Sequence, residues 1–489
     1  MRAMRRWMAG AAAAAALLAA AGCGGSTSGS SGGGNAAGIV PASAPIFVTV
    51  DTDLNSDQWN TVQGLLDKFP GKTKLLNQLR RSFEKDSGVT WEDVKAALGP
   101  EVDVALLNFG AGTNAVGLMQ PKDADKWDAL VKKHNATTKT PSDKIYSEDV
   151  QGWTVIADSQ AKLDLFKQQA SSGDKLADDA TYKDATAKLP DSALVTAYAS
   201  GGKTTAALKR ALQGVSGLSG GRGKLLWLAA DGVAQNDGLK VDVFTKSTGA
   251  TKTPGPYTAK LANVVPAGVL VYLSFNGEGF DTSSFQSAMN GLSGLPGAGQ
   301  FVGILKQLGP IFAHENALYV RPGAGIPEVT LVAQPDSAQQ GIAAIDKLIA
   351  TIAQSAGTPL KPKPLTIGSV KVKELNLGRF SIYYGLLGGK LVVTDAQQAF
   401  QDLQAGGQKF ASDATFKEAQ QAAGMPGQTN GFLYVNLKDS IPLIENLAQL
   451  GGSQLPAEVT ENLKPLRTFV AWVSAKGGEG QATLFLEVK

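Results

Sequence analysis

Residues 176–185 read Leu-Ala-Asp-Asp-Ala-Thr-Tyr-Lys-Asp-Ala, and residues 410–419 read Phe-Ala-Ser-Asp-Ala-Thr-Phe-Lys-Glu-Ala. The second stretch follows the first at a distance of 234 residues, and most of their differences exchange similar side chains. A repeated segment bears on the whole architecture, because each copy specifies one structural unit. We therefore compare the remainder of the two halves of the chain.

Three further pairs of segments recur in the same order. They are Val40-Pro41-Ala42 with Val265-Pro266-Ala267, residues 116–124 with 330–338, and residues 226–230 with 471–475. Their spacings are 225, 214 and 245 residues. The differences between these spacings would be loop insertions, which folded proteins tolerate well. We expect two homologous units, residues 39–250 and 262–489, joined through the proline-containing stretch 251–256.

Helix and strand signals mix within each unit without a strict βαβ order. Asn55 with Gln58, and Thr90 with Asp93, are candidate helix capping pairs. Residues 101–109 and 114–120 have the composition of a strand pair, and an apolar stripe of helical period runs through residues 342–352. The sequence predicts an α+β fold in which each repeat is a largely antiparallel sheet with packed helices.

Several short motifs along the mature chain resemble one known family. They are residues 40–45, residues 68–71, the junction at 97–102, and residues 176–185 followed by Leu189-Pro190. With these motifs the chain resembles a family of uncharacterised bacterial exported proteins, the domain of unknown function 3352. The resemblance implies an extracytoplasmic and often lipidated protein, and it assigns no activity and no functional residues.

The N-terminus has the three parts of an export signal. Arg2, Arg5 and Arg6 precede an apolar run over residues 9–21, which is too short to span a bilayer comfortably. Residues 18–23, Leu-Ala-Ala-Ala-Gly-Cys, resemble the lipobox of bacterial lipoproteins. The resemblance implies a signal peptide over residues 1–22 and a diacylglycerol on Cys23, which then becomes the first mature residue.

Cys23 is the only cysteine, so it forms no internal disulfide. The alternative is a lone buried cysteine, which the neighbouring Gly/Ser tract disfavours because that tract offers no core. Residues 23–38 are expected to form a lipidated, flexible linker. The protein would then lie on the extracytoplasmic face of the cell membrane, held there by its acyl chains.

The charge balance excludes some partners. The chain has 46 Lys+Arg and 43 Asp+Glu, and removal of the three signal arginines leaves 43 of each. A mature chain with no net charge is a poor candidate for binding nucleic acid, which depends on neutralising phosphates. No later stretch has the length and apolar character of a transmembrane helix. We therefore expect a membrane partner through the lipid anchor and no nucleic acid.

Three glycine-rich motifs suggest ligand-binding or catalytic loops. Gly201-Gly202-Lys203-Thr204 suggests a phosphate loop, residues 217–221 match the G-x-S-x-G nucleophile elbow, and residues 297–303 suggest a dinucleotide loop. Each lacks part of its context: the first glycine of the phosphate loop falls at Ala197, the elbow follows a helix, and no strand precedes residues 297–303. Ordinary glycine turns are the favoured interpretation, and no cofactor is expected.

Metal ligands and aromatic platforms give equally weak signals. His134 and His314 are the only histidines, and neither has the spacing of a metal motif. An oxygen-only calcium site from Asp103 with Asp178-Asp179 stays open, although the aspartate pair more often caps a helix. Trp59, Trp91, Trp127, Trp153, Trp227 and Trp472 are expected to anchor the core.

Three hypotheses for the function follow from these signals. The leading hypothesis is a non-enzymatic binding or assembly module of the cell envelope. The second is a carrier of an apolar ligand such as a lipid, with a pocket between the repeats. The third is an extracytoplasmic hydrolase whose serine, histidine and carboxylate come together only in the fold.

Overall fold

The computed structural model describes residues 35–109, 113–138, 140–171, 173–204, 224–249, 255–277, 309–323, 327–356, 359–378, 380–450 and 455–489. The predicted signal peptide, Cys23 and the linker up to residue 34 lie outside these ranges. The loops at 217–221 and 297–303 lie outside them as well.

The first half of the chain supplies eight strands. They are β1 (Ile46–Asp51), β2 (Glu101–Phe109), β3 (Thr113–Met119), β4 (Tyr146–Val150), β5 (Trp153–Ala157), β6 (Val195–Ser200), β7 (Lys224–Gln235) and β8 (Gly238–Thr248). Its helices are η1 (Ala36–Gly38), α2 (Asp57–Leu66), α3 (Lys72–Ser87), α4 (Trp91–Ala97), α5 (Ala124–Thr137), η2 (Pro141–Asp143), α6 (Gln160–Ser171), η3 (Leu176–Asp178) and α7 (Ala180–Thr186).

The second half supplies the other ten described strands. They are β9 (Val271–Asn276), β10 (Glu315–Arg321), β11 (Glu328–Ala333), β12 (Lys363–Ile367), β13 (Val370–Asn376), β14 (Ser381–Leu387), β15 (Lys390–Thr394), β16 (Gly431–Asn436), β17 (Leu466–Lys476) and β18 (Glu479–Val488). Its helices are η5 (Lys260–Asn263), η6 (Gly309–Phe312), α11 (Ala338–Ala356), α12 (Gln398–Gln404), η7 (Phe410–Ser412), α13 (Ala414–Ala422), α14 (Leu437–Leu450) and α15 (Ala457–Leu463).

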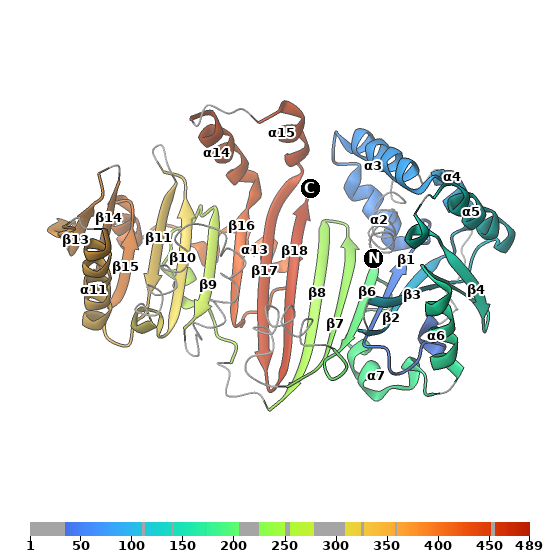
Figure 1. Cartoon of the computed structure of the whole chain (residues 1–489). Coiled ribbons are helices and arrows are strands. Elements are labelled where there is room, and N and C mark those ends of the chain that lie inside the picture. Colours follow the sequence, from blue (N-terminus) through green and yellow to red (C-terminus); the bar gives the residue numbers. More distant parts are fainter. Residues whose placement is uncertain are drawn as a thin grey trace.

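All 18 described strands form one sheet, and every pairing in it is antiparallel (Figure 1). The pairings give the order β4-β5-β3-β2-β1-β6-β7-β8-β18-β17-β16-β9-β10-β11-β15-β14-β13-β12. The protein is therefore a mixed α+β protein with a large antiparallel sheet, as the sequence predicted.

The two halves meet where β8 pairs with β18, a junction that we call the seam. Its register runs from Lys246 opposite Glu479 to Gly238 opposite Glu487, with Asp242 opposite Thr483 near the middle. Long hairpins, β7–β8 and β17–β18, flank the seam on each side. The continuous hydrogen-bonded ladder joins the halves through main chain, which no sequence motif had indicated.

Strand alternation gives the sheet two different faces. The tyrosine face carries Tyr198, Tyr272, Tyr319 and Tyr434, all nearly fully buried, in two large apolar clusters that include residues of α7 and α13. The aliphatic face is the opposite one. Smaller clusters pack it against α2, against α3 to α5, and against α11.

Several local predictions can now be compared with the fold. The strand expected over residues 101–109 is β2, and Thr90 with Asp93 forms a reciprocal capping box at the start of α4. The first capping pair was wrong by one residue, because Ser56 rather than Asn55 caps α2. Ser56 also donates to Asp51, and this contact fixes it at the helix start.

The predicted boundaries of the folded units were late. The linker was expected to extend to residue 38, but Ala36 and Ala37 are buried in η1 and belong to the body. The second unit was expected to begin at residue 262, yet Tyr257 already pairs with Thr429 and η5 begins at Lys260. Alanine and asparagine resemble linker residues in composition, so only the tertiary contacts reveal these starts.

Candidate functional sites

The N-terminal edge of the described body is clamped to the sheet. The side chain of Asn35 caps η1 and donates to the hydroxyl of Tyr182 on α7 at 3.3 Å. The backbone N–H of Ala36 donates to Oδ2 of Asp103 on β2 at 2.7 Å, in a buried position. We call these four residues, Asn35, Ala36, Asp103 and Tyr182, the N-terminal clamp.

Asp103 of the clamp has a second acidic residue, Glu101, beside it. Glu101 and Asp103 are two positions apart on β2 and so face the same side, next to Asp51 on β1. Burial, together with the charge of Asp103, raises the pKa of Glu101 to about 8. Burial also raises the pKa of Asp103 to about 6, against the stabilising hydrogen bonds to its carboxylate. Near neutral pH the pair therefore keeps one proton, which reduces the repulsion beneath η1.

A second group of buried acids lies at the seam. Asp231 on β7 faces Asp242 on β8, and Asp242 accepts from Thr483 on β18. The Lys240 ammonium lies 3.0 Å from Asp242, whereas Oδ2 of Asp231 is buried without a hydrogen bond. Burial and the charge of Asp242 raise the pKa of Asp231 to about 6. Sequence inspection missed this group, because its only signal was a single aspartate, Asp231, within an apolar strand segment.

The glycine-lysine motif forms a turn that holds neighbouring segments together. Gly201 follows β6, and its N–H donates to the carbonyl oxygen of Leu226 at 2.8 Å. The Lys203 ammonium lies 2.9 Å from Asp179 and also donates to the carbonyl oxygen of Ala42. These contacts favour a structural role for Lys203 over phosphate binding. Residues 205–223, which follow the motif, lie outside the described ranges.

The aspartates considered for calcium are used in other ways. Asp179 caps α7 by accepting from the N–H groups of Thr181 and Tyr182. Asp103 holds Ala36, as described above, and Asp178 lies in η3 and forms an exposed ion pair with Lys183. Within the described ranges, no three His, Cys, Asp or Glu side chains gather in a way that could hold a metal ion.

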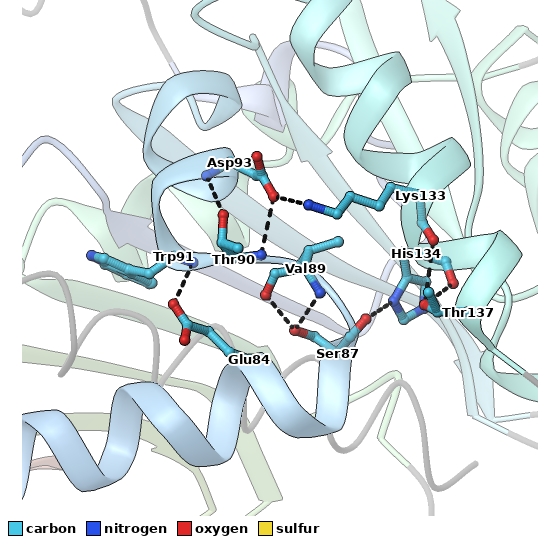
Figure 2. Close-up of polar contacts among 9 residues, drawn as sticks. All are labelled: Glu84, Ser87, Val89, Thr90, Trp91, Asp93, Lys133, His134 and Thr137. Carbon is cyan, nitrogen blue, oxygen red and sulfur yellow. Dashed lines mark hydrogen bonds and ion pairs between the residues drawn. The ribbon is translucent and has the colours of Figure 1, made fainter.

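His134 links α5 to two other segments. Its Nδ1 lies 2.7 Å from the carbonyl oxygen of Ser87 at the end of α3, and its Nε2 lies 2.9 Å from that of Asp143 in η2. Figure 2 shows the contact with Ser87 within a wider polar network. His314 is partly exposed and lies 3.2 Å from Asp336. Each histidine therefore has a local partner.

The same network fixes α4 between α3 and α5 (Figure 2). Glu84 accepts from the N–H of Trp91 at 3.0 Å, and this hydrogen bond lowers the pKa of Glu84. Asp93 accepts from Lys133 at 2.6 Å as well as from Thr90, and these contacts lower its pKa. We interpret the network as a brace for the helices, because its hydrogen bonds join α3 to α4, α4 to α5 and α5 to α3.

The tryptophans expected in the core are there. Trp59, Trp91, Trp127, Trp227 and Trp472 are buried, and Trp153 is partly buried against the first tyrosine-face cluster. The indole N–H of Trp227 donates to Asp184 at 2.8 Å, so even its polar atom is engaged. The prediction that these residues anchor the core is confirmed.

Three large apolar side chains are exposed on the aliphatic face near the seam. Leu239, Val241 and Leu484 are 41%, 42% and 40% exposed, and Val241 lies opposite Leu484 across the seam. The paired residues of this face carry no charge over the eight described strands β1, β6–β9 and β16–β18. Exposed apolar area of this kind is a candidate binding surface.

No described helix combines the length and apolar character needed to cross a membrane. The chain matches no family model and no curated protein sequence, so the resemblance to the exported family stays a prediction. Three crystal structures of TP0453, forms IV, I and III, are similar in part, at 13%, 14% and 11% identity. They cover 47%, 46% and 46% of this chain and 81%, 78% and 92% of theirs, with TM-scores of 0.25, 0.26 and 0.26. A likeness this slight supports no conclusion about this chain.

Proposed function

We propose that this protein is a bacterial lipoprotein, held at the extracytoplasmic face of a membrane by a diacylglycerol on Cys23. In this proposal its body is a binding or assembly module of the cell envelope. The observation that carries the proposal is the N-terminal clamp. The backbone N–H of Ala36 donates to the buried Asp103 at 2.7 Å, so the folded body begins at this point and the proposed tether runs from Cys23 to Asn35.

The length of the tether sets how far the body can move from the membrane. Twelve residue steps separate Cys23 from Asn35, and the intervening segment is rich in glycine and serine. A fully extended chain covers about 3.4 Å per residue, so the clamp stays within roughly 40 Å of the acylated cysteine. A flexible Gly/Ser chain would usually hold it closer.

Fractionation of the producing bacterium tests the anchor. The unaltered protein is expected in the detergent phase after phase separation, and a Cys23→Ser variant in the aqueous phase. Ser28→Ala, a change in the same linker that leaves the thiol in place, is the matched control and should behave like the unaltered protein. A Cys23→Ser protein that stays in the detergent phase would overturn the proposal.

We propose that the body acts by binding rather than by catalysis. Support comes from the structural contacts of the groups that the sequence had suggested for chemistry. Lys203 pairs with Asp179, Asp179 caps α7, and His134 contacts two backbone carbonyl groups. Saturable turnover of an ester, peptide or glycoside by the purified protein, lost on substitution of His134 and His314, would contradict this part of the proposal.

We further propose that the two halves are homologous repeats, residues 39–250 and 262–489 with the earlier starts described above. Isolated bridges support it: Pro41 pairs with Lys175, and Pro266 pairs with Lys409, at shifts of 225 and 234 residues. The strand registers agree as well. Ile46 lies opposite Leu106, and the residues 225 and 214 positions further on, Val271 and Val320, also lie opposite each other.

One of the four sequence matches does not fit this proposal. Val195 and Gly431 are the first residues of the matching strands β6 and β16. Val195 lies opposite Gly232 and Gly431 lies opposite Val473, so β7 and β17 correspond at a shift of 241 residues. That shift matches Trp472 with Asp231, whereas the sequence comparison matched Trp472 with Trp227. It also makes Asp242 and Thr483 equivalent, and these residues lie opposite each other at the seam. The proposed repeats would thus meet about a pseudo-twofold axis.

A carrier of an apolar ligand is the second candidate function. The half-exposed Leu239, Val241 and Leu484 on the aliphatic face favour it, because they form an uncharged surface that an acyl chain could cover. Native mass spectrometry of protein prepared without detergent is the test. The candidate predicts a bound lipid that is lost in a Val241→Lys variant; a spectrum of the unaltered protein without lipid would rule it out.

A further inference from the structure

The two ends of the sheet are finished differently. At one end, β14 pairs with β13, and β13 pairs with β12, so two extra strands extend the sheet beyond β14. At the other end the last strand is β4, which pairs with β5 on one side and with no described strand on the other. Figure 1 shows β4 at one margin of the sheet and β13 near the opposite margin.

β4 and β14 occupy the same place in their hairpins. Val150 and Trp153 close the β4–β5 turn around Gln151 and Gly152, both of which have positive φ. Leu387 and Lys390 close the β14–β15 turn around two glycines with positive φ. In two-residue turns of this kind the two closing residues form a hydrogen-bonded pair. Every second residue of the strand, counted from the one before the closing residue, therefore directs its backbone N–H and C=O groups away from the partner strand. The backbone groups of Ser147 and Asp149 therefore lie on the free edge of β4.

Two tyrosines on the β4 and β14 strands differ in how far they are covered. Tyr383 lies four residues before the end of β14 and opposite Glu374 of β13, and it is 9% exposed. Tyr146 lies four residues before the end of β4, opposite Ala157 of β5 and with no described strand on its other side, and is 37% exposed. These two tyrosines thus differ in exposure: Tyr383 has a strand on each side, whereas Tyr146 has a described strand on one side.

The opposite margin of the sheet is protected against further pairing. Ile367 and Val370 close the β12–β13 turn, so Pro364 and Thr366 are the outward residues of β12. Pro364 has no N–H to donate, and a proline at an outward position blocks the addition of another strand. β4 contains no proline, and its edge has no such block.

We propose that the free edge of β4 binds an extended, basic strand of another envelope protein, which adds to the sheet as β13 does at β14. This inference builds on the assembly role proposed above. The chemistry of the partner follows from charge: β4 has no basic residue, Glu148 is already paired with Lys167 of α6 at 2.6 Å, and Asp149 is the exposed acid. β13 has the alternating sequence Val-Lys-Val-Lys, and a partner of this type would place a lysine near Asp149.

A second copy of this chain is a poor occupant of the edge. β4 has no basic residue, so pairing with another β4 gives the exposed Asp149 no opposite charge; in a pairing about the centre it lies opposite Ser147. Pairing of β4 with β12 of a second copy meets Pro364 at an outward position. The edge therefore fits a different chain.

Hydrogen exchange with a defined probe tests the proposal. The protein is the full chain carrying Cys23→Ser, so that acylation does not affect the result. The probe is a synthetic peptide of residues 363–376, which contains β12 and β13, and the control peptide replaces Lys371 and Lys373 with glutamate. The amides of Ser147 and Asp149 should exchange readily in the free protein and at least tenfold more slowly with saturating probe.

Two variants separate edge pairing from other modes of binding. Ser147→Pro removes an outward N–H, and Asp149→Lys keeps the backbone but reverses the charge, so each should weaken probe binding at least tenfold. Thr366→Ala on β12 is the matched control and should leave binding unchanged. The proposal is overturned if the probe fails to bind at millimolar concentration, protects a different segment, or binds both edge variants normally. A dimer abolished by Ser147→Pro would also overturn it, in favour of a second copy.

Discussion

Replacement of Asp231 by asparagine should stabilise the protein at neutral and alkaline pH. Asp231 is buried at the seam, faces Asp242, and has an oxygen without a hydrogen bond. Its pKa is raised from 3.8 to about 6 by burial and by the charge of Asp242. A carboxyl whose pKa is raised by folding favours the folded state when protonated, and this stability is lost as the pH rises through 6.

The size of the effect follows from the shift. A difference of about 2 pKa units corresponds to roughly 3 kcal/mol at most, since each unit is worth about 1.4 kcal/mol. Asp231→Asn keeps the shape of the neutral acid and cannot ionise. Its free energy of unfolding should therefore exceed that of the unaltered protein by about 2–3 kcal/mol at pH 8. Between pH 6 and pH 4 the difference should shrink towards zero.

Urea denaturation followed by tryptophan fluorescence, repeated from pH 4 to pH 8, measures this difference. Asp191→Asn, at an exposed aspartate, is the matched control and should follow the unaltered protein throughout. Glu101 and Asp103 titrate in all three proteins and cancel in the comparison. A constant difference at every pH, or an Asp231→Asn protein that is less stable at pH 8, would refute the argument.

Three other substitutions test local parts of the fold. Gly201→Ala should be strongly destabilising in thermal unfolding, because its Cβ would lie 2.1 Å from a carbonyl oxygen of β7, whereas Gly202→Ala meets no atom within 4 Å and should be neutral. Thr90→Ala removes the capping box of α4 and should cost about 1 kcal/mol in the free energy of unfolding; an unchanged stability would refute the role of the cap. Asp179→Ala and Asp413→Ala each remove a cap with the same two backbone contacts, so both should destabilise by about 1–2 kcal/mol, and an effect at only one site would weigh against equivalent repeats.

Parts of the fold that depend on local sequence were predictable. The alternation through residues 101–109 gives β2, and the Thr90–Asp93 pattern gives the start of α4, because both signals act within a few residues. The apolar stripe through residues 342–352 lies in α11, with Ile345 and Ile349 buried. The mixed α+β class followed from these elements.

Features that depend on distant contacts were not predictable from one sequence. The seam joins Asp242 to Thr483, which are 241 residues apart, and no motif marks either strand as an edge that would pair. The β12–β13 hairpin extends the sheet beyond β14, and the composition of its strands does not say which edge it extends. Asn35 and Ala36 look like linker residues until the contacts with Tyr182 and Asp103 are known.

Among the candidate sites, too, some follow from local sequence and others depend on distant contacts. The interpretation of Asp179 as a helix cap came from residue preferences alone, and the structure agrees with it. The raised pKa of Asp231 and the exposure of Tyr146 depend on burial and on the place of each strand in the sheet. Sequence inspection gives neither quantity, so these residues were missed.

Intact mass spectrometry of the mature N-terminal peptide tests the lipoprotein proposal most directly. From the membrane fraction, we expect a peptide that begins at Cys23 and is heavier than its amino-acid mass by a thioether-linked diacylglycerol. A mature protein that begins at another residue, or an unmodified Cys23 in protein taken from the membrane, would contradict the account.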